Sequence, residues 1–419
     1  MAITSQIARP RISPAVATLS LLIALNLLNY IDRYILPGEL SLIQREFHAT
    51  DHQMGALTTA LFIFYMIAAP LTGWLGDRYP RKPLIITGAV MWSLATLATV
   101  WVHGYWTFYI RQAFVGIGEA TFGIFAPAVL ADFYPERERN RILSIFYLAI
   151  PVGAALGYLA GGELSFGGVW RRPFFICAIP GFIIAALYGW WGREPERGSS
   201  DRVKSIAHRP TFREQFRNLL GLFRNPAFLT ATFGLATLTF AMGGISNWVP
   251  EFLHRSAGFS VANASLMVGG ATVVDGIAGT LVGGWIAQRW LRTNHRALYL
   301  LSFWSVALTL PCGVLLFFGP HACAIPALFA AEFFLFLNTG PLNAAIVNSV
   351  SAPVRATAVS INLFIIHCFG DTFSPQIIGA ISDRTKSLSL GLGATLIFLI
   401  ISCVILWNGA RYAPLMEDV

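Results

Sequence analysis

Two adjacent charged residues stand inside an apolar run and are the first candidates for chemistry. Asp32 and Arg33 lie in the stretch NYIDRY (29–34), within a run that starts near residue 15 and has no other charge before Glu39. Each full charge in the middle of a membrane-spanning helix costs about 3 kcal/mol on insertion scales. Such residues face a water-filled cavity or pair with charges on neighbouring helices. Because adjacent helical residues point about 100° apart, Asp32 and Arg33 need different partners.

A second pair of membrane charges, Arg111 and Glu119, lies in another apolar run. Eight residues separate them, which in a helix corresponds to about two turns and ~80° around the axis. Both side chains can therefore face one cavity. We interpret the two pairs of charges as one network. It is either a permanent set of ion pairs that holds two helices together or a set that switches partners.

Composition defines the class of protein. The chain has 419 residues, of which 55% are hydrophobic and 12% are charged, whereas soluble proteins are usually about 25% charged. Apolar runs of about 20 residues recur along the chain, which predicts an all-α polytopic membrane protein. The five cysteines show no metal-ligand spacing, and we find no ATP-binding loop and no hydrolase or protease motif. We therefore expect no enzyme activity, cofactor or metal, and an energy source in an ion gradient or in the substrate's own gradient.

The basic residues predict how the chain crosses the membrane. We expect twelve spans, at roughly 15–37, 53–75, 83–102, 105–133, 141–165, 172–192, 227–253, 261–287, 297–318, 322–350, 355–382 and 388–411. With this topology, 21 Lys and Arg residues lie on the side of the N-terminus and 6 on the other side. The positive-inside rule then places both termini in the cytoplasm. The net charge of +8 reflects this asymmetry and does not indicate nucleic acid binding.

The long polar loop in the middle of the chain predicts three parts: a six-span bundle at 1–192, a cytoplasmic linker at 193–226 and a second bundle at 227–419. Within the linker, residues 211–223 have the apolar spacing of a helix that lies on the membrane surface. The two halves also share a weak repeat at residues 73–82 and 284–292. In each stretch, a glycine stands four residues before an acid or amide, and an arginine directly follows that residue. Matching loops in two halves are typical of an alternating-access transporter.

The first of these loops resembles the signature of the major facilitator superfamily, G-x-x-x-D-R-x-G-R-K, with Pro80 in place of the second glycine. The resemblance implies twelve transmembrane helices in two pseudo-symmetric six-helix bundles, and a loop that latches the halves in the outward-facing state. We call the matching residues the gating loop: Gly73, Asp77, Arg78, Arg81 and Lys82.

Further stretches are similar to the Spinster family, namely 29–34, 111–120, 146–153, 370–375 and 382–383. This resemblance implies transport of sphingosine-1-phosphate, lysophospholipids or related amphipathic molecules. The short termini favour a bacterial member, and hence the inner (cytoplasmic) membrane. Since facilitator folds place spans 1 and 4 side by side, it also implies that Asp32 pairs with Arg111 and Arg33 with Glu119.

These residues suggest a proton-coupled mechanism. A carboxylate beside an arginine stays ionised, and takes up a proton when the arginine leaves or the site dries. The arginine is then free to bind an anionic group such as a phosphate. We assign proton coupling to Asp32 and Glu119 and the substrate anion to Arg33 or Arg111.

The second half offers weaker candidates. They are asparagines of span 10 and a His–Asp pair four residues apart in span 11, which packing or hydrogen bonding alone could also explain. These possible cavity residues are Asn338, Asn343, His367 and Asp371.

The sequence therefore predicts a secondary active transporter that moves an amphipathic, lipid-like anion by alternating access with proton coupling. The alternatives are a carrier for a polar organic anion or drug, or a uniporter that ignores protons. The expected partners are a lipid-like small molecule, protons and the bilayer, and we expect a monomer.

Overall fold

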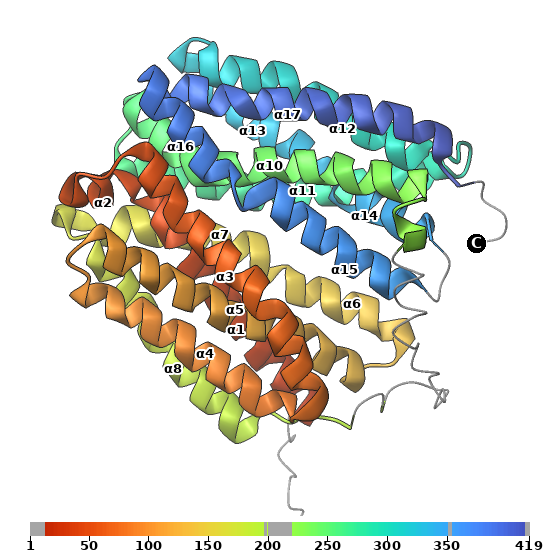
Figure 1. Ribbon diagram of the computed structural model, residues 1–419, viewed down its shortest axis with the longest axis horizontal. Coiled ribbons are helices and arrows are strands. Elements are labelled where there is room, and N and C mark those ends of the chain that lie inside the picture. Colours follow the sequence, from red (N-terminus) through yellow and green to blue (C-terminus); the bar gives the residue numbers. More distant parts are fainter. Residues whose placement is uncertain (1–12, 197–198, 200–219, 351–353, 415–419) are drawn as a thin grey trace, which may run out of the picture.

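The computed structural model describes residues 13–196, 199, 220–350 and 354–414. Within these residues every regular element is a helix (Figure 1). The first half contains α1 (Pro14–Gly38), the short α2 (Leu40–Phe47), α3 (Asp51–Arg78), α4 (Arg81–Ala98), η1 (Thr99–Trp101), α5 (Tyr105–Phe133), α6 (Glu136–Tyr147), α7 (Ala149–Leu164), η2 (Phe166–Gly168) and α8 (Arg171–Trp191).

The second half contains α10 (Pro226–Arg255), α11 (Val261–Leu291), α12 (Ala297–Phe318), η3 (His321–Cys323), α13 (Ala324–Leu337), α14 (Thr339–Asn348), α15 (Arg355–Ile366), η5 (His367–Asp371), α16 (Ser374–Thr385), α17 (Leu388–Gly409) and η6 (Ala410–Tyr412). The predicted surface helix at 211–223 lies almost wholly outside the described residues.

Eleven segments of the described chain are long and apolar enough to cross a membrane. The one predicted span that is not among these eleven segments, at 355–382, corresponds to α15, η5 and α16, where a π-helical turn at His367–Asp371 interrupts the α-helix. The prediction of an all-α polytopic membrane protein is confirmed, and the described helices are consistent with twelve spans.

Local sequence explains where several helices begin. Thr50 caps α3 through a capping box, in which Thr50 Oγ1 accepts from the backbone of Gln53 and the Gln53 side chain accepts from the backbone of Thr50. The hydroxyl groups of Ser260 and Ser387 likewise accept hydrogen bonds from backbone N–H groups in the first turns of α11 and α17. These caps lie at turns between apolar runs and fix the ends of the spans.

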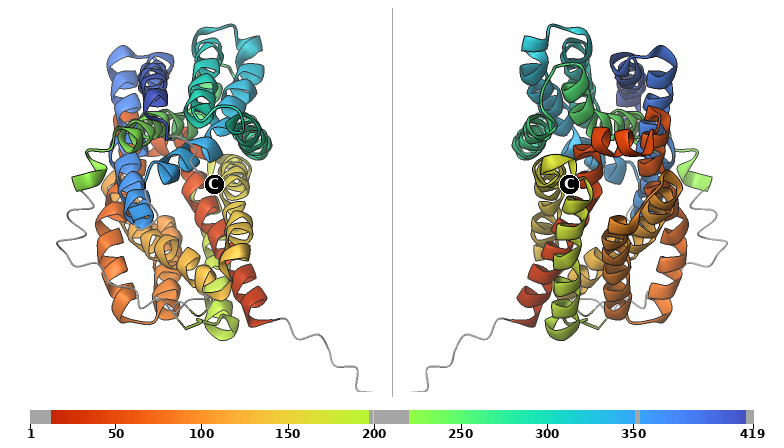
Figure 2. Two further views of the ribbon diagram at one scale, coloured as in Figure 1. Left: turned by 90° about the vertical axis from the view of Figure 1, so that its right-hand side faces the viewer. Right: turned by 90° about the vertical axis from the view of Figure 1, so that its left-hand side faces the viewer.

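The helices of the two halves lie in separate regions, those of the first half below those of the second half in Figure 1 and in both views of Figure 2. They meet most closely along α7 with α11 and along α3 with α16. The contact between α3 and α16 needs glycine, because a Cβ on Gly55 would lie 2.3 Å from the carbonyl oxygen of Pro375, and one on Gly379 would lie 2.2 Å from that of Asp51. These contacts close the end of the molecule that carries α2, which we call the α2 end.

Glycines also position α5 between α3 and α4. A Cβ on Gly116 would lie 2.1 Å from the carbonyl oxygen of Leu61 in α3, and one on Gly118 would lie 2.8 Å from that of Gly88 in α4. Small residues at such contacts let helix backbones approach closely. Glu119, which follows Gly118, is thereby held deep inside the first half.

The close approach at Gly55 generates a prediction about closure of the α2 end. Gly55→Val places side-chain atoms against the backbone of Pro375 and should separate the halves there. A nitroxide pair on Glu163 and Lys386, introduced into a chain without its native cysteines, should report a longer distance by pulsed electron paramagnetic resonance. Gly270→Val is the matched control, because a Cβ on Gly270 meets nothing within 4 Å. An unchanged distance in Gly55→Val would refute the role of this contact.

Candidate substrate cavity and charged network

A cavity of about 270 Å³ lies between the two halves. Its wall combines aromatic and aliphatic side chains with a few charged groups, and both halves contribute to it. Residues of the first half that line it include Tyr30, Arg33, Tyr34, Phe62 and Tyr158, and residues of the second half include Met242, Asn247, Glu332, Phe336, His367 and Asp371.

Arg33 is the cavity residue that belongs to the predicted network. Its Nε donates to Glu119 Oε2 at 3.1 Å and its Nη2 contacts the same oxygen. The guanidinium also lies 5.0 Å from the ring centre of Tyr30 and 5.3 Å from that of Phe62, which are favourable cation–π distances. The Glu119 side chain is fully buried, whereas 16% of the Arg33 side chain is exposed. The ion pair therefore borders the cavity through its cationic partner.

The other pair, Asp32 and Arg111, lies inside the first half. Arg111 Nη2 is 3.6 Å from Asp32 Oδ1, and both side chains are buried. Asp32 also accepts a hydrogen bond from Thr96, while Arg111 Nε donates to the carbonyl of Ala95 at 3.1 Å.

The structure thus contains both pairs that were predicted, but they do not face one cavity. Arg111 borders a groove between α4 and α5, on the far side of α5 from the cavity. Of the two arginines, Arg33 lines the cavity and Arg111 does not.

The second-half candidates divide in two. His367 and Asp371 line the cavity and contact each other, with His367 Nδ1 3.0 Å from Asp371 Oδ1. The His367 ring stacks on Phe62 of the first half, 5.9 Å between centres. Asn338 instead donates to Ser305 and to the carbonyl of Leu335 away from the cavity, and Asn343 is exposed and bonds its own helix. The asparagines are therefore explained by packing and helix geometry in this structure.

The described contacts of the gating loop are with residues of the first half and with Glu194, which follows the first half in the chain. Arg78 stacks on Trp74 at 4.0 Å, and Arg81 pairs with Asp132 of α5 at 2.5 Å. The backbone N–H groups of Arg81 and Lys82 donate to the carboxylate of Glu194, an arrangement that caps the N-terminus of α4. A Cβ on Gly73 would meet nothing within 4 Å, so no neighbouring helix packs closely against Gly73 in this conformation. The Asp77 side chain is outside the described part.

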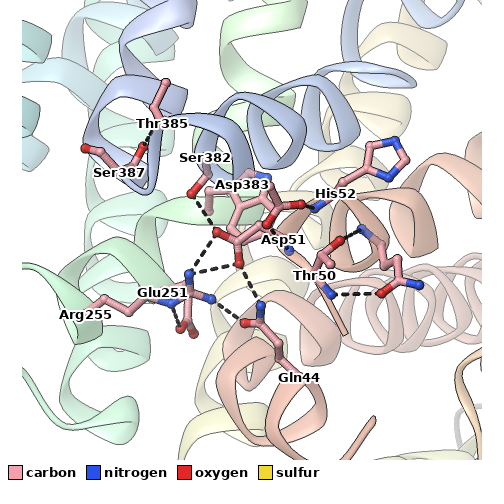
Figure 3. A network of polar contacts seen from close by, with 12 residues as sticks. Gln44, Thr50, Asp51, His52, Glu251, Arg255, Ser382, Asp383, Thr385 and Ser387 are labelled. Atoms are coloured by element: carbon pink, nitrogen blue, oxygen red, sulfur yellow. Dashed lines mark hydrogen bonds and ion pairs between the residues drawn. The ribbon is translucent and has the colours of Figure 1, made fainter. Parts of the chain in front are cut away.

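A polar network ties the halves together at the α2 end (Figure 3). Arg255 of α10 donates from Nη1 to both carboxylate oxygens of Asp51, at 2.9 and 3.0 Å. Asp383 of α16 accepts from the backbone N–H groups of Asp51 and His52, and Ser382 donates to Asp51 at 2.6 Å. We call these five residues the α2-end network. Sequence reasoning missed it because its members are ordinary loop-end polar residues that only the fold brings together.

Sequence reasoning also gave little weight to Glu332, a buried residue of α13 on the cavity wall. An acid inside an apolar span was the available signal. The contact between Thr58 Oγ1 and Asn247 Oδ1, 2.7 Å across the two halves, had no such signal, because neutral polar residues are common in spans.

Comparisons with known proteins agree with this architecture. Residues 22–375 match the model of the Major Facilitator Superfamily. Protein spinster homolog 1 of Xenopus tropicalis is 34% identical over 394 residues, which cover 89% of this chain and 74% of the relative. The chain belongs to the Spinster family of the major facilitator superfamily. It is a membrane transporter and not an enzyme.

Two further similarities concern function and fold. The sphingosine-1-phosphate transporter SPNS2 of Xenopus tropicalis is 30% identical over 404 residues, covering 90% of this chain and 77% of the relative. The crystal structure of a bacterial homolog of the human lysosomal transporter Spinster, inward-facing and unoccupied, superposes with a TM-score of 0.85 at 22% identity, covering 96% of this chain and 98% of that one.

The buried pair of Arg33 and Glu119 generates a prediction about stability. Arg33→Gln should destabilise the protein by about 3 kcal/mol, because Glu119 is left as an unpaired buried charge. Lowering the pH should reduce this loss, since a proton on Glu119 removes the charge. The double variant Arg33→Gln/Glu119→Gln should lose less than the sum of the single variants. Thermal unfolding in detergent at several pH values measures this. Arg171→Gln is the control, because it breaks the more exposed pair with Glu46 and should lower the stability by less than about 1 kcal/mol. Equal losses of stability in Arg33→Gln and Arg171→Gln would contradict the prediction.

The α2-end network generates a second prediction. Arg255→Gln removes charge-assisted hydrogen bonds between the halves and should favour their separation by about 2 kcal/mol. The nitroxide pair on Glu163 and Lys386 should then show a larger long-distance population. Arg171→Gln again serves as the control, because Arg171 bonds Glu46 and the carbonyl of Val102 within the first half. If the native chain, Arg255→Gln and Arg171→Gln all gave the same distance distribution, the network would not be what keeps the halves together at the α2 end.

Proposed function

We propose that the protein is a proton-coupled secondary transporter for an amphipathic, lipid-like anion of the lysophospholipid or sphingosine-1-phosphate class. The single observation that carries the proposal is Arg33, a cation at the edge of a largely apolar cavity whose own counter-ion, Glu119, can be neutralised by a proton. The similarity to a sphingosine-1-phosphate transporter supports the substrate class.

The cavity wall supports an amphipathic substrate. A phosphate or similar group would bind Arg33 through charge-assisted hydrogen bonds. Phe62, Met242 and Phe336 offer an apolar surface for the remaining part of the molecule. A small polar anion would leave this apolar surface unused. A carrier for polar organic anions or drugs is for this reason only the second candidate.

Proton coupling follows from the ion pair. While Glu119 is ionised it occupies Arg33, and a proton on Glu119 frees Arg33 for the substrate anion. The same exchange applies to Asp32 and Arg111, which would carry the effect to α5 without contacting the substrate. His367 and Asp371, which contact each other, also face the cavity. A uniporter would need none of these changes.

We assign the orientation from the basic residues and the movement from the contacts between the halves. The bias of 21 against 6 Lys and Arg favours cytoplasmic termini in the inner membrane, which makes the α2 end the outer end. Residues 1–192 and 227–419, acting as a monomer, would rock about the cavity. The α2-end network would hold the outer end closed, and the gating loop would engage the second half when the inner end closes.

The proposal predicts pH-driven transport that depends on Glu119. Proteoliposomes with the native chain should take up a lysophospholipid or sphingosine-1-phosphate faster when a pH gradient is imposed. Glu119→Gln should transport but lose the response to the gradient, by at least about tenfold, and Asp32→Asn should weaken it. Arg33→Ala should lose uptake of the anion. Asn343→Ala is the matched control, because Asn343 lies outside the cavity.

Each result separates the candidates. Lipid transport that ignores the gradient in the native chain would indicate a uniporter. Transport of a small organic anion without any lipid would indicate the second candidate. A pH response that persists in both carboxyl variants would rule out their role in coupling.

A further inference from the structure

Glu39 is a buried acid that the mechanism above does not use. It lies where α1 ends and α2 begins, at the α2 end, and its exposed fraction is 0%. Neither of its carboxyl oxygens has a hydrogen-bond partner among the described residues. An ionised carboxylate in such a place would cost several kcal/mol, so the group holds a proton.

The side chain of Glu39 does not make the local hydrogen bond that its position at the start of α2 would allow. Glu39 is the N-cap residue of α2, but its side chain makes no capping hydrogen bond. An acid at a helix N-terminus usually gains from the free N–H groups and the helix dipole, by about 1 kcal/mol. Glu39 is instead fully buried, which indicates that its placement is not explained by stabilising α2.

Glu39 directly follows α1, which ends at Gly38, and continuing the helix by one residue would place it near the face that carries Asp32. The two residues are seven positions apart, which corresponds to a rotation of only about 20° and a rise of roughly 10 Å. Cys177 of α8 is close enough to both carboxyl groups for each to act on its thiol electrostatically. Thr96 donates to Asp32, and Thr99, one turn nearer the α2 end, has a buried hydroxyl without a described partner. Polar groups thus continue from Asp32 towards Glu39 inside the first half.

The charged groups on the surrounding helices are engaged elsewhere. Arg111 of α5 bonds Ala95 and Gln112 and faces Asp32. Arg171 of α8 bonds Glu46. From α7, the hydroxyl of Tyr158 donates to the carbonyl of Ser246. With burial as the only influence acting on it, the pKa of the Glu39 carboxyl is raised well above its ordinary value.

Closure of the α2 end seals Glu39 from water. The neighbouring carbonyl of Gly38 accepts a hydrogen bond from Ser265 of α11 at 2.9 Å. A Cβ on Gly38 would lie 2.9 Å from the carbonyl oxygen of Tyr158 in α7. Separation of the halves would break the first contact and admit water near the carboxyl group, where its ionised form becomes accessible.

We propose that Glu39 is the outer proton-exchange site of the transporter and passes its proton to Asp32 through the interior of the first half. In the step, the Glu39 carboxyl loses a proton and becomes a carboxylate, the Asp32 carboxylate gains that proton and becomes neutral, and water at the outer side later protonates Glu39 again. Because roughly 10 Å exceeds one hydrogen bond, hydroxyl groups or water must carry the proton between them. The inference rests on the proposed proton coupling and adds a route that avoids the substrate cavity.

Two measurements test the relay. Infrared spectra of reconstituted protein should show the carbonyl band of a protonated buried carboxyl, which disappears in Glu39→Gln. In proteoliposomes, Glu39→Gln should exchange substrate without a gradient at a rate within about twofold of the native rate. Its accumulation of substrate driven by a pH gradient should fall at least about tenfold. Glu39→Asp should recover part of the accumulation. Glu163→Gln is the matched control, because Glu163 is an exposed acid at the same end.

The outcomes distinguish failure of the relay from failure of the proposed function. A band that persists in Glu39→Gln, or full gradient-driven accumulation in that variant, overturns the relay while proton coupling stands. Transport by the native chain that ignores the gradient overturns the proposed coupling and the relay with it. Glu39→Leu provides a second test if the glutamine variant does not fold, since an apolar side chain suits the surroundings and also removes the proton site.

Discussion

The requirement that every charge in the membrane has a partner organises the first half of this protein. Two acids and two arginines on α1 and α5 form two pairs, Arg33 with Glu119 and Asp32 with Arg111. Removing one member of a buried pair costs far more than the pair contributes. The two helices must therefore keep their register. The glycines on both sides of Ile117 allow this, because they bring α5 against the backbones of α3 and α4.

The two pairs differ in their surroundings, and this difference separates their roles. Arg33 reaches the cavity, whereas Asp32 and Arg111 are enclosed by α4, α5 and α8. A change at the cavity acts directly on the first pair and reaches the second through α1, on which Asp32 and Arg33 are neighbours. The arrangement thus connects the cavity, which is the proposed substrate site, to buried groups that do not line it.

Much of this could be predicted from the sequence because hydrophobic runs and isolated charges are local signals. The spans followed from run length, and the pairing of α1 with α5 followed from the family resemblance. The spacing of Arg111 and Glu119 suggested a shared cavity, but eight residues and ~80° fix only a relative direction, and the packing of α5 turned Arg111 away. The α2-end network depends on contacts between segments distant in sequence, such as Asp51 with Arg255. No local pattern encodes these contacts.

In the proposed mechanism, binding of the substrate and binding of the proton depend on each other. When Glu119 is ionised, an anion near Arg33 competes with a fixed carboxylate that already satisfies the guanidinium. When Glu119 is protonated, Arg33 is left as an uncompensated charge beside a largely apolar cavity, which costs several kcal/mol. An anionic headgroup offsets that cost, so the protonated state without substrate is the unfavourable one. In the proposed mechanism, binding of the proton and binding of the anion therefore favour each other, which is the thermodynamic condition for coupled movement of both.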